Sequence, residues 1–227
     1  MRLGIKIFFI GALIMVAFGQ NELLKGVRWL GHASFLIERA GKVIYFDPFQ
    51  LSEGLPKADI IFITHTHFDH LSVKDIKKIA TEKTLIVATA DAQSELKGYK
   101  VKTVAPGDEL EIDGLKVKVI PAYNIGKRFH PKEKGWVGYI VNIGGVSYYH
   151  AGDTDFISEM KEVKADVAFL PVGGTYTMDW KEGVEACKSM EVKICVPMHW
   201  GSIVGSRKDA ENFKASCKKA VILEAEK

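Results

Sequence analysis

The sequence predicts a layered α/β domain, and two observations lead to this prediction. Short apolar or alternating segments of strand length recur along the chain, and helical patterns interrupt them in both halves. Of the 227 residues, 47% are hydrophobic and 26% are charged, which is close to the globular average. A chain of this length buries a sizeable core without staples, so a disordered chain and a disulfide-dense miniprotein are excluded.

Strand patterns dominate the first two thirds of the chain. The continuous apolar segment Ala58–Thr64 is typical of a strand buried on both faces. Ser72–Thr81 has apolar residues at helical spacing after an N-capping serine, and Asp91–Lys97 is a second expected helix. The other expected strands are Val27–Leu30, Ser34–Glu38, Val43–Asp47, Thr84–Ala88, Val101–Val104, Glu109–Ile112, Leu115–Pro121, Trp136–Ile143 and Val146–His150.

The last third mixes both kinds of element. Helices are expected at Trp180–Met190 and Asp209–Lys218, and strands at Val167–Pro171, Lys193–Pro197 and Ala220–Leu223. Strands with interposed helices in both halves favour two sheets packed face to face with the helices outside. No Pro/Gly/Ser-rich linker divides the chain, so we expect a single domain over residues 20–227.

The first twenty residues have the pattern of a signal peptide. The basic residues Arg2 and Lys6 precede an uncharged apolar segment, Ile7–Phe18, which is short for a membrane span of ~20 residues. We predict a signal peptide over residues 1–19 and an exported protein, periplasmic or extracellular, that begins at Gln20. A retained N-terminal membrane anchor and a buried first helix are the alternatives. No second apolar segment of this kind follows, so no membrane span is expected after cleavage.

The three cysteines, Cys187, Cys195 and Cys217, indicate little about function. They are odd in number and lack CxxC spacing. In an exported protein one pair could be oxidised, and the sequence does not say which. Cys195 lies in an apolar strand pattern, where we interpret it as a small buried hydrophobe.

The strongest chemical signal is the segment Thr64–His70, which reads THTHFDH and directly follows a buried strand. Imidazole and carboxylate are the ligands that borderline divalent metals prefer. Alternate residues of an extended segment point the same way, so His65 and His67 can bind one ion. Asp69 and His70 follow as the chain turns and can face a second ion. A solvated polar loop, the alternative, would not explain three imidazoles beside apolar sequence.

Two later segments place further ligand-type residues just past expected strands. Asp153 lies in the segment HAGDT, and His199 lies in the segment PMHWG. Because loops at strand ends gather functional residues, we expect both near the THTHFDH segment. An aspartate can bridge two metals with its two oxygens, which suits Asp153.

These motifs together resemble the metallo-β-lactamase superfamily of metal-dependent hydrolases. The segments LGHASF (30–35), DPF (47–49), HAGDT (150–154), PVGGTYTM (171–178) and PMHWG (197–201) are similar to its ascorbate-6-phosphate-lactonase-like branch, and the match runs from Val27 onward. The resemblance implies a four-layer αββα sandwich of two mixed β-sheets, with one or two divalent ions (Zn, Mn, Ni or Fe) at the rim between the sheets. It implies as ligands His65 and His67 on one metal, Asp69, His70 and His199 on the other, and Asp153 bridging, with His32 close by.

The chain departs from the family pattern at Asn124. The superfamily usually has a further histidine on the first metal at this place, and an amide oxygen is the weaker ligand. His130, six residues later, is the nearest imidazole that could substitute. We slightly favour His130 as the ligand over Asn124 or an open position. Whether one ion or two are bound depends on this.

Other residues have two interpretations. Asp47 is either a strand-end turn or a hydrogen-bond partner for a ligand histidine. The remaining candidates are the aromatic or apolar residues Tyr176, Met178 and Trp200, which border the site or belong to the core, and the basic residues Lys127, Arg128, Lys132 and Lys134, which form a solvated loop or attract an anionic substrate.

We therefore predict a metal-dependent hydrolase that uses a metal-activated water on an ester, lactone, amide or phosphodiester bond of a small molecule. Asp69 would hold or deprotonate the water, and His32 or His199 would assist the leaving group or the developing anion. The alternative is a metal-binding protein with little or no catalysis, such as a sensor or scavenger. A net charge of +3 without a basic, aromatic-rich appendage argues against a nucleic-acid partner.

The leader makes the first testable prediction. Intact-mass and N-terminal peptide analysis of the protein from its native host should show a mature chain that begins at Gln20, because the small residues Ala17 and Gly19 have the spacing of the positions before a signal-peptidase cut. A soluble intracellular pool with an intact Met1 would contradict export.

Overall fold

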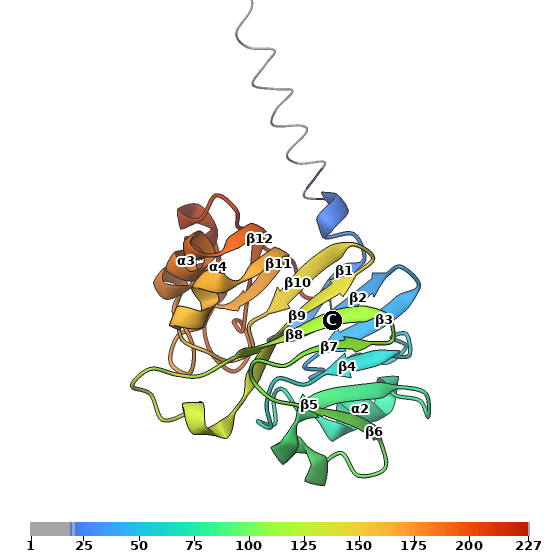
Figure 1. Cartoon of the computed structure of the whole chain (residues 1–227). Helices are drawn as coiled ribbons and strands as arrows, with labels where there is room; N and C mark the ends of the chain where they lie inside the picture. Colours follow the sequence, from blue (N-terminus) through green and yellow to red (C-terminus); the bar gives the residue numbers. More distant parts are fainter. Residues whose placement is uncertain (1–18, 20, 227) are drawn as a thin grey trace, which may run out of the picture.

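The computed structural model describes Gly19 and residues 21–226 (Figure 1). Apart from Gly19, the predicted signal peptide lies outside these residues. Two six-stranded sheets lie face to face, and helices cover their outer sides (Figure 1). Within the described residues, no helix combines the length and apolar character needed to cross a bilayer.

The first sheet has the strand order β1-β2-β3-β4-β5-β6. β1 to β3 pair antiparallel, and β3 to β6 pair parallel, so the sheet is mixed. Its strands are β1 (Val27–Gly31), β2 (Ser34–Arg39), β3 (Lys42–Phe46), β4 (Ile60–Phe62), β5 (Leu85–Thr89) and β6 (Lys100–Val104).

The second sheet has the order β12-β11-β10-β9-β8-β7 and is also mixed. β7 to β10 pair antiparallel, and β10 to β12 pair parallel. Its strands are β7 (Glu109–Ile112), β8 (Leu115–Pro121), β9 (Val137–Ile143), β10 (Val146–His150), β11 (Lys164–Pro171) and β12 (Glu191–Met198).

Three helices form the outer layers. α2 (Val73–Ile79) packs on the first sheet through its buried isoleucines, and the Ser72 side chain caps it, as the sequence predicts. α3 (Trp180–Ser189) and α4 (Arg207–Ser216) pack on each other and on β12. The predicted αββα sandwich is therefore the fold of this protein.

Aromatic stacking joins the inner faces of the two sheets. The ring of Phe46 on β3 lies 5.1 Å from that of Phe62 on β4 and 5.2 Å from the imidazole of His150 on β10. The rings of Phe35 and Phe169 lie 4.0 Å apart between β2 and β11. These contacts hold the strand ends in register, which fixes the loops that follow them.

Two sequence predictions about elements are wrong. Ala90–Ser94 forms a short 3₁₀ helix instead of the α-helix predicted over Asp91–Lys97, because few residues separate β5 from β6 and a left-handed Gly98 intervenes. The segment predicted as a last strand, Ala220–Leu223, makes only a single bridge, from Ala220 to Cys195 at the edge of the sheet.

The cysteines are more informative in the structure than in the sequence. Cys187 on α3 and Cys195 on β12 form a disulfide, so Cys195 is buried as the sequence predicts but belongs to an oxidised pair that the sequence could not identify. The thiol of Cys217 is buried, 3.0 Å from the Cys187 sulfur. The three sulfurs thus tie the outer helices to the second sheet.

Phe46 is a direct test of the packing between the sheets. Phe46→Ala should lower the free energy of unfolding by about 3–5 kcal/mol, because the ring is fully buried between the two sheets. Phe68→Ala, the same change at a side chain that is 69% exposed, should alter it by no more than about 0.5 kcal/mol. Urea unfolding of the metal-free protein measures both, and equal losses would contradict this packing.

Candidate metal centre

The predicted site residues converge on one edge of the sandwich. His32 lies between β1 and β2, and the segment His65–His70 follows β4. His130 lies between β8 and β9, Asp153 follows β10, and His199 follows β12. The two sheets therefore bring together residues from distant parts of the sequence (Figure 1).

One group of three imidazoles gathers around the first predicted metal position. Ring nitrogens of His65, His67 and His130 all lie within 4.8 Å of one another. The nearest nitrogens of His65 and His67 are 3.1 Å apart. Three imidazole nitrogens at these separations can hold one divalent transition ion.

A second group lies beside the first. Ligand atoms of His32, Asp69, His70 and His199 lie within 4.8 Å of one another. His32 Nε2 is 2.9 Å from Asp69 Oδ2, and the rings of His32 and His199 are 3.9 Å apart. This group mixes a carboxylate with imidazoles, as the sequence predicts for the second ion.

Asp153 lies between the two groups. Its Oδ2 is 3.3 Å from His130 Nε2 and 3.0 Å from His199 Nε2, and its Oδ1 is 3.3 Å from His70 Nε2. All three of those Nε2 atoms and Asp153 Oδ1 are buried without a hydrogen-bond partner. Buried polar atoms are rarely left unpaired. Their convergence on common space fits a centre with room for two ions.

Hydrogen bonds behind the ligand groups set the orientation of the imidazoles. Asp47 accepts from His70 Nδ1 at 2.7 Å and from the Thr64 hydroxyl at 2.6 Å. Because that hydroxyl donates to Asp47, it accepts from His65 Nδ1 at 2.9 Å. Both imidazoles therefore turn Nε2 toward the centre, and Asp47 is a hydrogen-bond partner as well as a turn residue.

The structure places His130, and not Asn124, in the first imidazole group. His130 Nδ1 donates to Asn124 Oδ1 at 3.0 Å, which directs Nε2 toward Asp153. The Asn124 amide nitrogen donates to Asp155 Oδ1 and to the Tyr176 carbonyl. Both polar atoms of Asn124 are thus used to hold the loop and the imidazole.

Burial sets the charge of these side chains. Burial lowers the pKa of His32 to about 4, against an opposing hydrogen bond from Asp69, and it lowers the pKa of His65 well below the usual value. Burial alone would raise the pKa of Asp153, but His199 and His70 hold it well below its usual value. Burial would lower the pKa of His70, but Asp153 and Asp47 raise it well above its usual value. His32 and His65 are thus neutral and Asp153 is ionised, which are the forms that bind metals, whereas His70 must release a proton when a metal binds.

Several ligand groups lie on strained backbone. His32, Asp47 and His199 have φ of 50°, 42° and 60°, a left-handed conformation that costs side-chain-bearing residues free energy. Close approach supports one of them, because a Cβ on Gly173 would lie 2.2 Å from the His199 carbonyl oxygen. Such strain is typical of functional sites.

The other sequence candidates divide between rim and core. Met178 is fully buried, and Trp200 donates its indole N–H to the Pro197 carbonyl. Tyr176 is half-buried at the rim, with its ring 4.6 Å from that of Phe129. His150 donates to the Ala33 carbonyl and lies outside both ligand groups.

The basic loop is largely neutralised. Lys127 pairs with buried Asp155 at 2.6 Å, and Lys132 pairs with Glu159 at 3.2 Å. Lys134 lies over the Trp136 ring. This pairing weakens the argument for an anionic substrate, because it leaves mainly Arg128 to attract one.

Sequence reasoning missed three residues that position the site. Thr64 orients His65, Asp155 holds the loop that carries His130, and the Trp136 ring lies 4.9 Å from the His65 ring. Thr64 directly precedes His65 and Asp155 follows Asp153 by two residues, so proximity to the motifs is the signal that could have found them.

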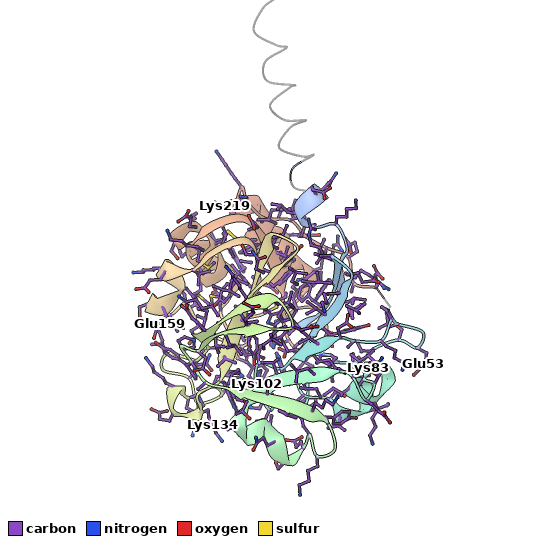
Figure 2. The ribbon with its side chains drawn as sticks, turned by 45° about the vertical axis from the view of Figure 1, so that its right-hand side comes forward. Glu53, Lys83, Lys102, Lys134, Glu159 and Lys219 are labelled. Carbon is purple, nitrogen blue, oxygen red and sulfur yellow. A yellow bond between two sulfur atoms is a disulfide. The ribbon has the colours of Figure 1, made fainter. Side chains whose placement is uncertain are left out.

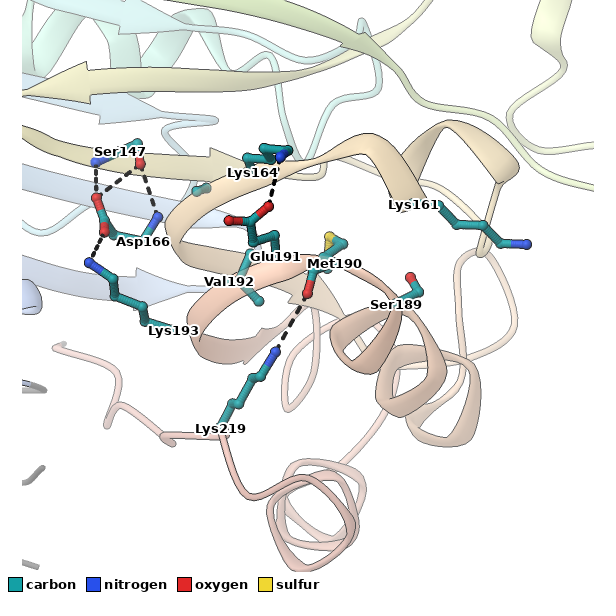
Figure 3. Close-up of a pocket in the computed structure, with 11 residues that line it drawn as sticks. Ser147, Lys161, Lys164, Asp166, Ser189, Met190, Glu191, Val192, Lys193 and Lys219 are labelled. Atoms are coloured by element: carbon teal, nitrogen blue, oxygen red, sulfur yellow. Dashed lines mark hydrogen bonds and ion pairs between the residues drawn. The ribbon is translucent and has the colours of Figure 1, made fainter. Parts of the chain in front are cut away.

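One wide hollow of the surface lies away from this centre. A cavity of about 910 Å³ is open at the start of β11 and β12 and is lined by Lys164, Lys193 and Lys219 (Figure 3). Lys164 pairs with Glu191, and Lys193 pairs with Asp166. Lys219 lies near the start of the described chain, toward the opposite end of the molecule from Lys134 (Figure 2). The cavity therefore contributes nothing to the metal centre.

Comparison with known proteins gives a consistent result. The family model described as a beta-lactamase superfamily domain matches residues 26–199. A metal-dependent hydrolase from Methanoculleus marisnigri is 35% identical over 198 residues, which cover 82% of this chain and 85% of that protein.

Solved structures agree with the sequence relatives. A candidate metal-dependent hydrolase from Parabacteroides distasonis is 33% identical with a TM-score of 0.78, over 88% of this chain and 93% of that one. A metallo hydrolase from Ignicoccus hospitalis is 26% identical with a TM-score of 0.74, over 88% of this chain and 95% of that one.

The position of His130 makes a prediction about metal affinity. His130→Ala should remove one of two bound ions, because it deletes an imidazole of the first group. Asn124→Ala should lower the affinity for the same ion by roughly 10–100-fold, because the substitution only frees the His130 imidazole to rotate. Asn142→Ala, at an exposed position on β9, is the matched control and should change nothing.

Calorimetric titration with Zn²⁺ or Mn²⁺ gives the affinities, and native mass spectrometry counts the ions. A greater loss in Asn124→Ala than in His130→Ala would make Asn124 the ligand.

Proposed function

The chain belongs to the beta-lactamase superfamily and is a metal-dependent hydrolase, and we propose that it cleaves an ester, lactone, amide or phosphodiester bond at a centre of two divalent ions. The observation that carries this proposal is the position of Asp153 between two ligand groups, with each carboxylate oxygen facing imidazole nitrogens. A single-ion centre would not need a buried carboxylate with partners on both sides.

The ligands divide between the two ions as follows. We assign His65, His67 and His130 to the first ion, and Asp69, His70 and His199 to the second, with Asp153 between them. Mixed imidazole and carboxylate ligands suit Zn, Mn, Ni or Fe. When bound, such ions would supply a water of lowered pKa and would polarise the scissile carbonyl or phosphoryl oxygen.

Asp69 is the residue proposed to orient that water and take its proton. A hydrogen bond with His32 lowers the pKa of Asp69 against the raising effect of burial, so the carboxylate is ionised at neutral pH. The His32 contact occupies Oδ2 and leaves Oδ1 to accept from water. The side chain is only slightly exposed, so water around it is restricted.

His32 and His199 are the proposed partners of the leaving group. Their rings lie side by side, and His32 Nδ1 and His199 Nδ1 are buried without a hydrogen-bond partner. The proton that Asp69 takes from the water is the one that the leaving atom needs, and His32, which donates Nε2–H to Asp69, would hold that carboxyl in place for both transfers.

We also propose that the protein is exported from the cytoplasm, because residues 1–19 have the pattern of a signal peptide.

This function predicts loss of turnover on metal removal. A chelator should abolish hydrolysis of responsive members of a panel of aryl esters, lactones and phosphodiesters, and Zn²⁺ or Mn²⁺ should restore it. Asp69→Asn should lower kcat by roughly 10²–10⁴-fold, the usual size of a general-base contribution. Asp113→Asn, the same change in the exposed β7–β8 turn, should keep wild-type kcat.

Steady-state kinetics on metal-loaded protein measure these effects. Tight metal binding without turnover on any member of the panel would instead favour a metal sensor or scavenger.

A further inference from the structure

The mouth of the metal centre is unusually apolar. In the part of the chain that the structure describes, four large hydrophobic side chains are exposed: Phe68 (69%), Ile125 (61%), Phe129 (45%) and Ile203 (42%). All four lie on loops that carry candidate ligands: Phe68 between His67 and Asp69, Ile125 and Phe129 beside His130, and Ile203 after His199. Exposed apolar side chains beside a site can contribute to ligand binding, and their contacts with a cavity indicate which of the four do so.

A cavity of about 540 Å³ is lined by His32 and by residues 200–202, which follow the candidate ligand His199. Its apolar wall includes Leu30, Phe49 and Trp200. The Phe49 ring lies 6.0 Å from the His32 ring on one side and 6.0 Å from the Phe68 ring on the other. The volume lies within the range of small-ligand pockets.

The charged residues of this cavity are already paired with each other. Arg207 donates two hydrogen bonds to the Glu224 carboxylate, at 2.7 and 2.8 Å. Glu226 accepts from Arg28 at 2.6 Å. A charged ligand group would have to compete with these partners, whereas a hydrocarbon group would contact the aromatic wall without disturbing them.

We propose that this cavity binds the hydrocarbon part of an amphiphilic ester or lactone, whose scissile carbonyl then lies at the metal centre beside His32. This inference rests on the proposed hydrolytic function and names its substrate class. Phe68 and Ile203 do not line the cavity, but each adjoins a residue that does: the Phe68 ring lies 6.0 Å from that of Phe49, and Ile203 follows Ser202 in the sequence. Each buried methylene gains free energy from leaving water, so longer chains bind more tightly until the cavity is full.

The loop that carries His130 provides matched controls. Ile125 and Phe129 are apolar and exposed like Phe68 and Ile203, but neither adjoins a residue that lines the cavity. Substitutions of these two residues test whether general surface hydrophobicity, and not this cavity, determines the preference for long hydrocarbon groups in the substrate.

The experiment uses p-nitrophenyl esters of acids with two to ten carbons and the metal-loaded protein. For wild type, kcat/KM should rise roughly two- to fourfold per methylene up to a plateau. The ratio of octanoyl to acetyl kcat/KM should fall at least tenfold in Phe68→Ser and Ile203→Ser, and it should keep its wild-type value in Ile125→Ser and Phe129→Ser. Equal chain dependence in all five proteins, or none in wild type, would overturn the proposal.

Binding separates this proposal from the proposed reaction. Acetate to decanoate are titrated into the same proteins, with quenching of tryptophan fluorescence as the readout, since Trp29 and Trp200 line the cavity. If longer acids bind more tightly to wild type, and Phe68→Ser and Ile203→Ser abolish this chain-length dependence, the proposed hydrocarbon site is supported. If no ester is hydrolysed in that case, only the proposed reaction is wrong. Ester hydrolysis without any dependence of acid binding on hydrocarbon length would support the proposed reaction but overturn the proposed hydrocarbon site.

Discussion

The burial of the Asp153 carboxylate among imidazoles is the interaction on which the rest of the site depends. An ionised carboxylate removed from water is costly unless cationic or metal partners surround it. His70, His130 and His199 approach it from three different loops, each with an Nε2 that has no hydrogen-bond partner. Because these buried Nε2 atoms lack partners, divalent cations between them and the carboxylate would satisfy both. The family relationship and the geometry thus point to the same chemistry.

Such convergence requires a stiff scaffold, and the two sheets supply it. Asp47 ends β3 in a left-handed conformation and fixes two imidazoles at once, one directly and one through Thr64. His199 is held by its backbone N–H, which donates to the His32 carbonyl, so two loops from different sheets are joined behind the metal positions. The aromatic layer between the sheets keeps these strand ends in place. The strained conformations persist because the core determines the positions of both flanking strands.

How far the sequence could predict this site follows from which contacts are local. The THTHFDH segment combines several candidate metal ligands within seven residues, so metal binding can be predicted from the sequence alone. The sandwich was predictable from strand patterns together with the resemblance, but the short 3₁₀ helix at Ala90–Ser94 was not, because tertiary spacing between β5 and β6 decides it. Whether His130 or Asn124 takes the ligand position depends on the hydrogen bonds that Asn124 donates to Asp155 and to the Tyr176 carbonyl. Both partners lie at least 31 residues from Asn124 in the sequence. Pattern reasoning gives the candidates there, and only the fold distinguishes them.

The contrast between a polar centre and an apolar mouth gives a physical reason for selectivity. Folding leaves much of the Phe68 and Ile203 side chains in water, with 69% and 42% of their surface exposed. A substrate that covers them gains the free energy that folding leaves unused, and it also excludes water from the space beside Asp69. In that drier space, the hydrogen bond between His32 and Asp69 and the attraction of the ligands for bound cations both strengthen. An apolar group next to the scissile bond would therefore contribute to the chemistry of the centre as well as to affinity.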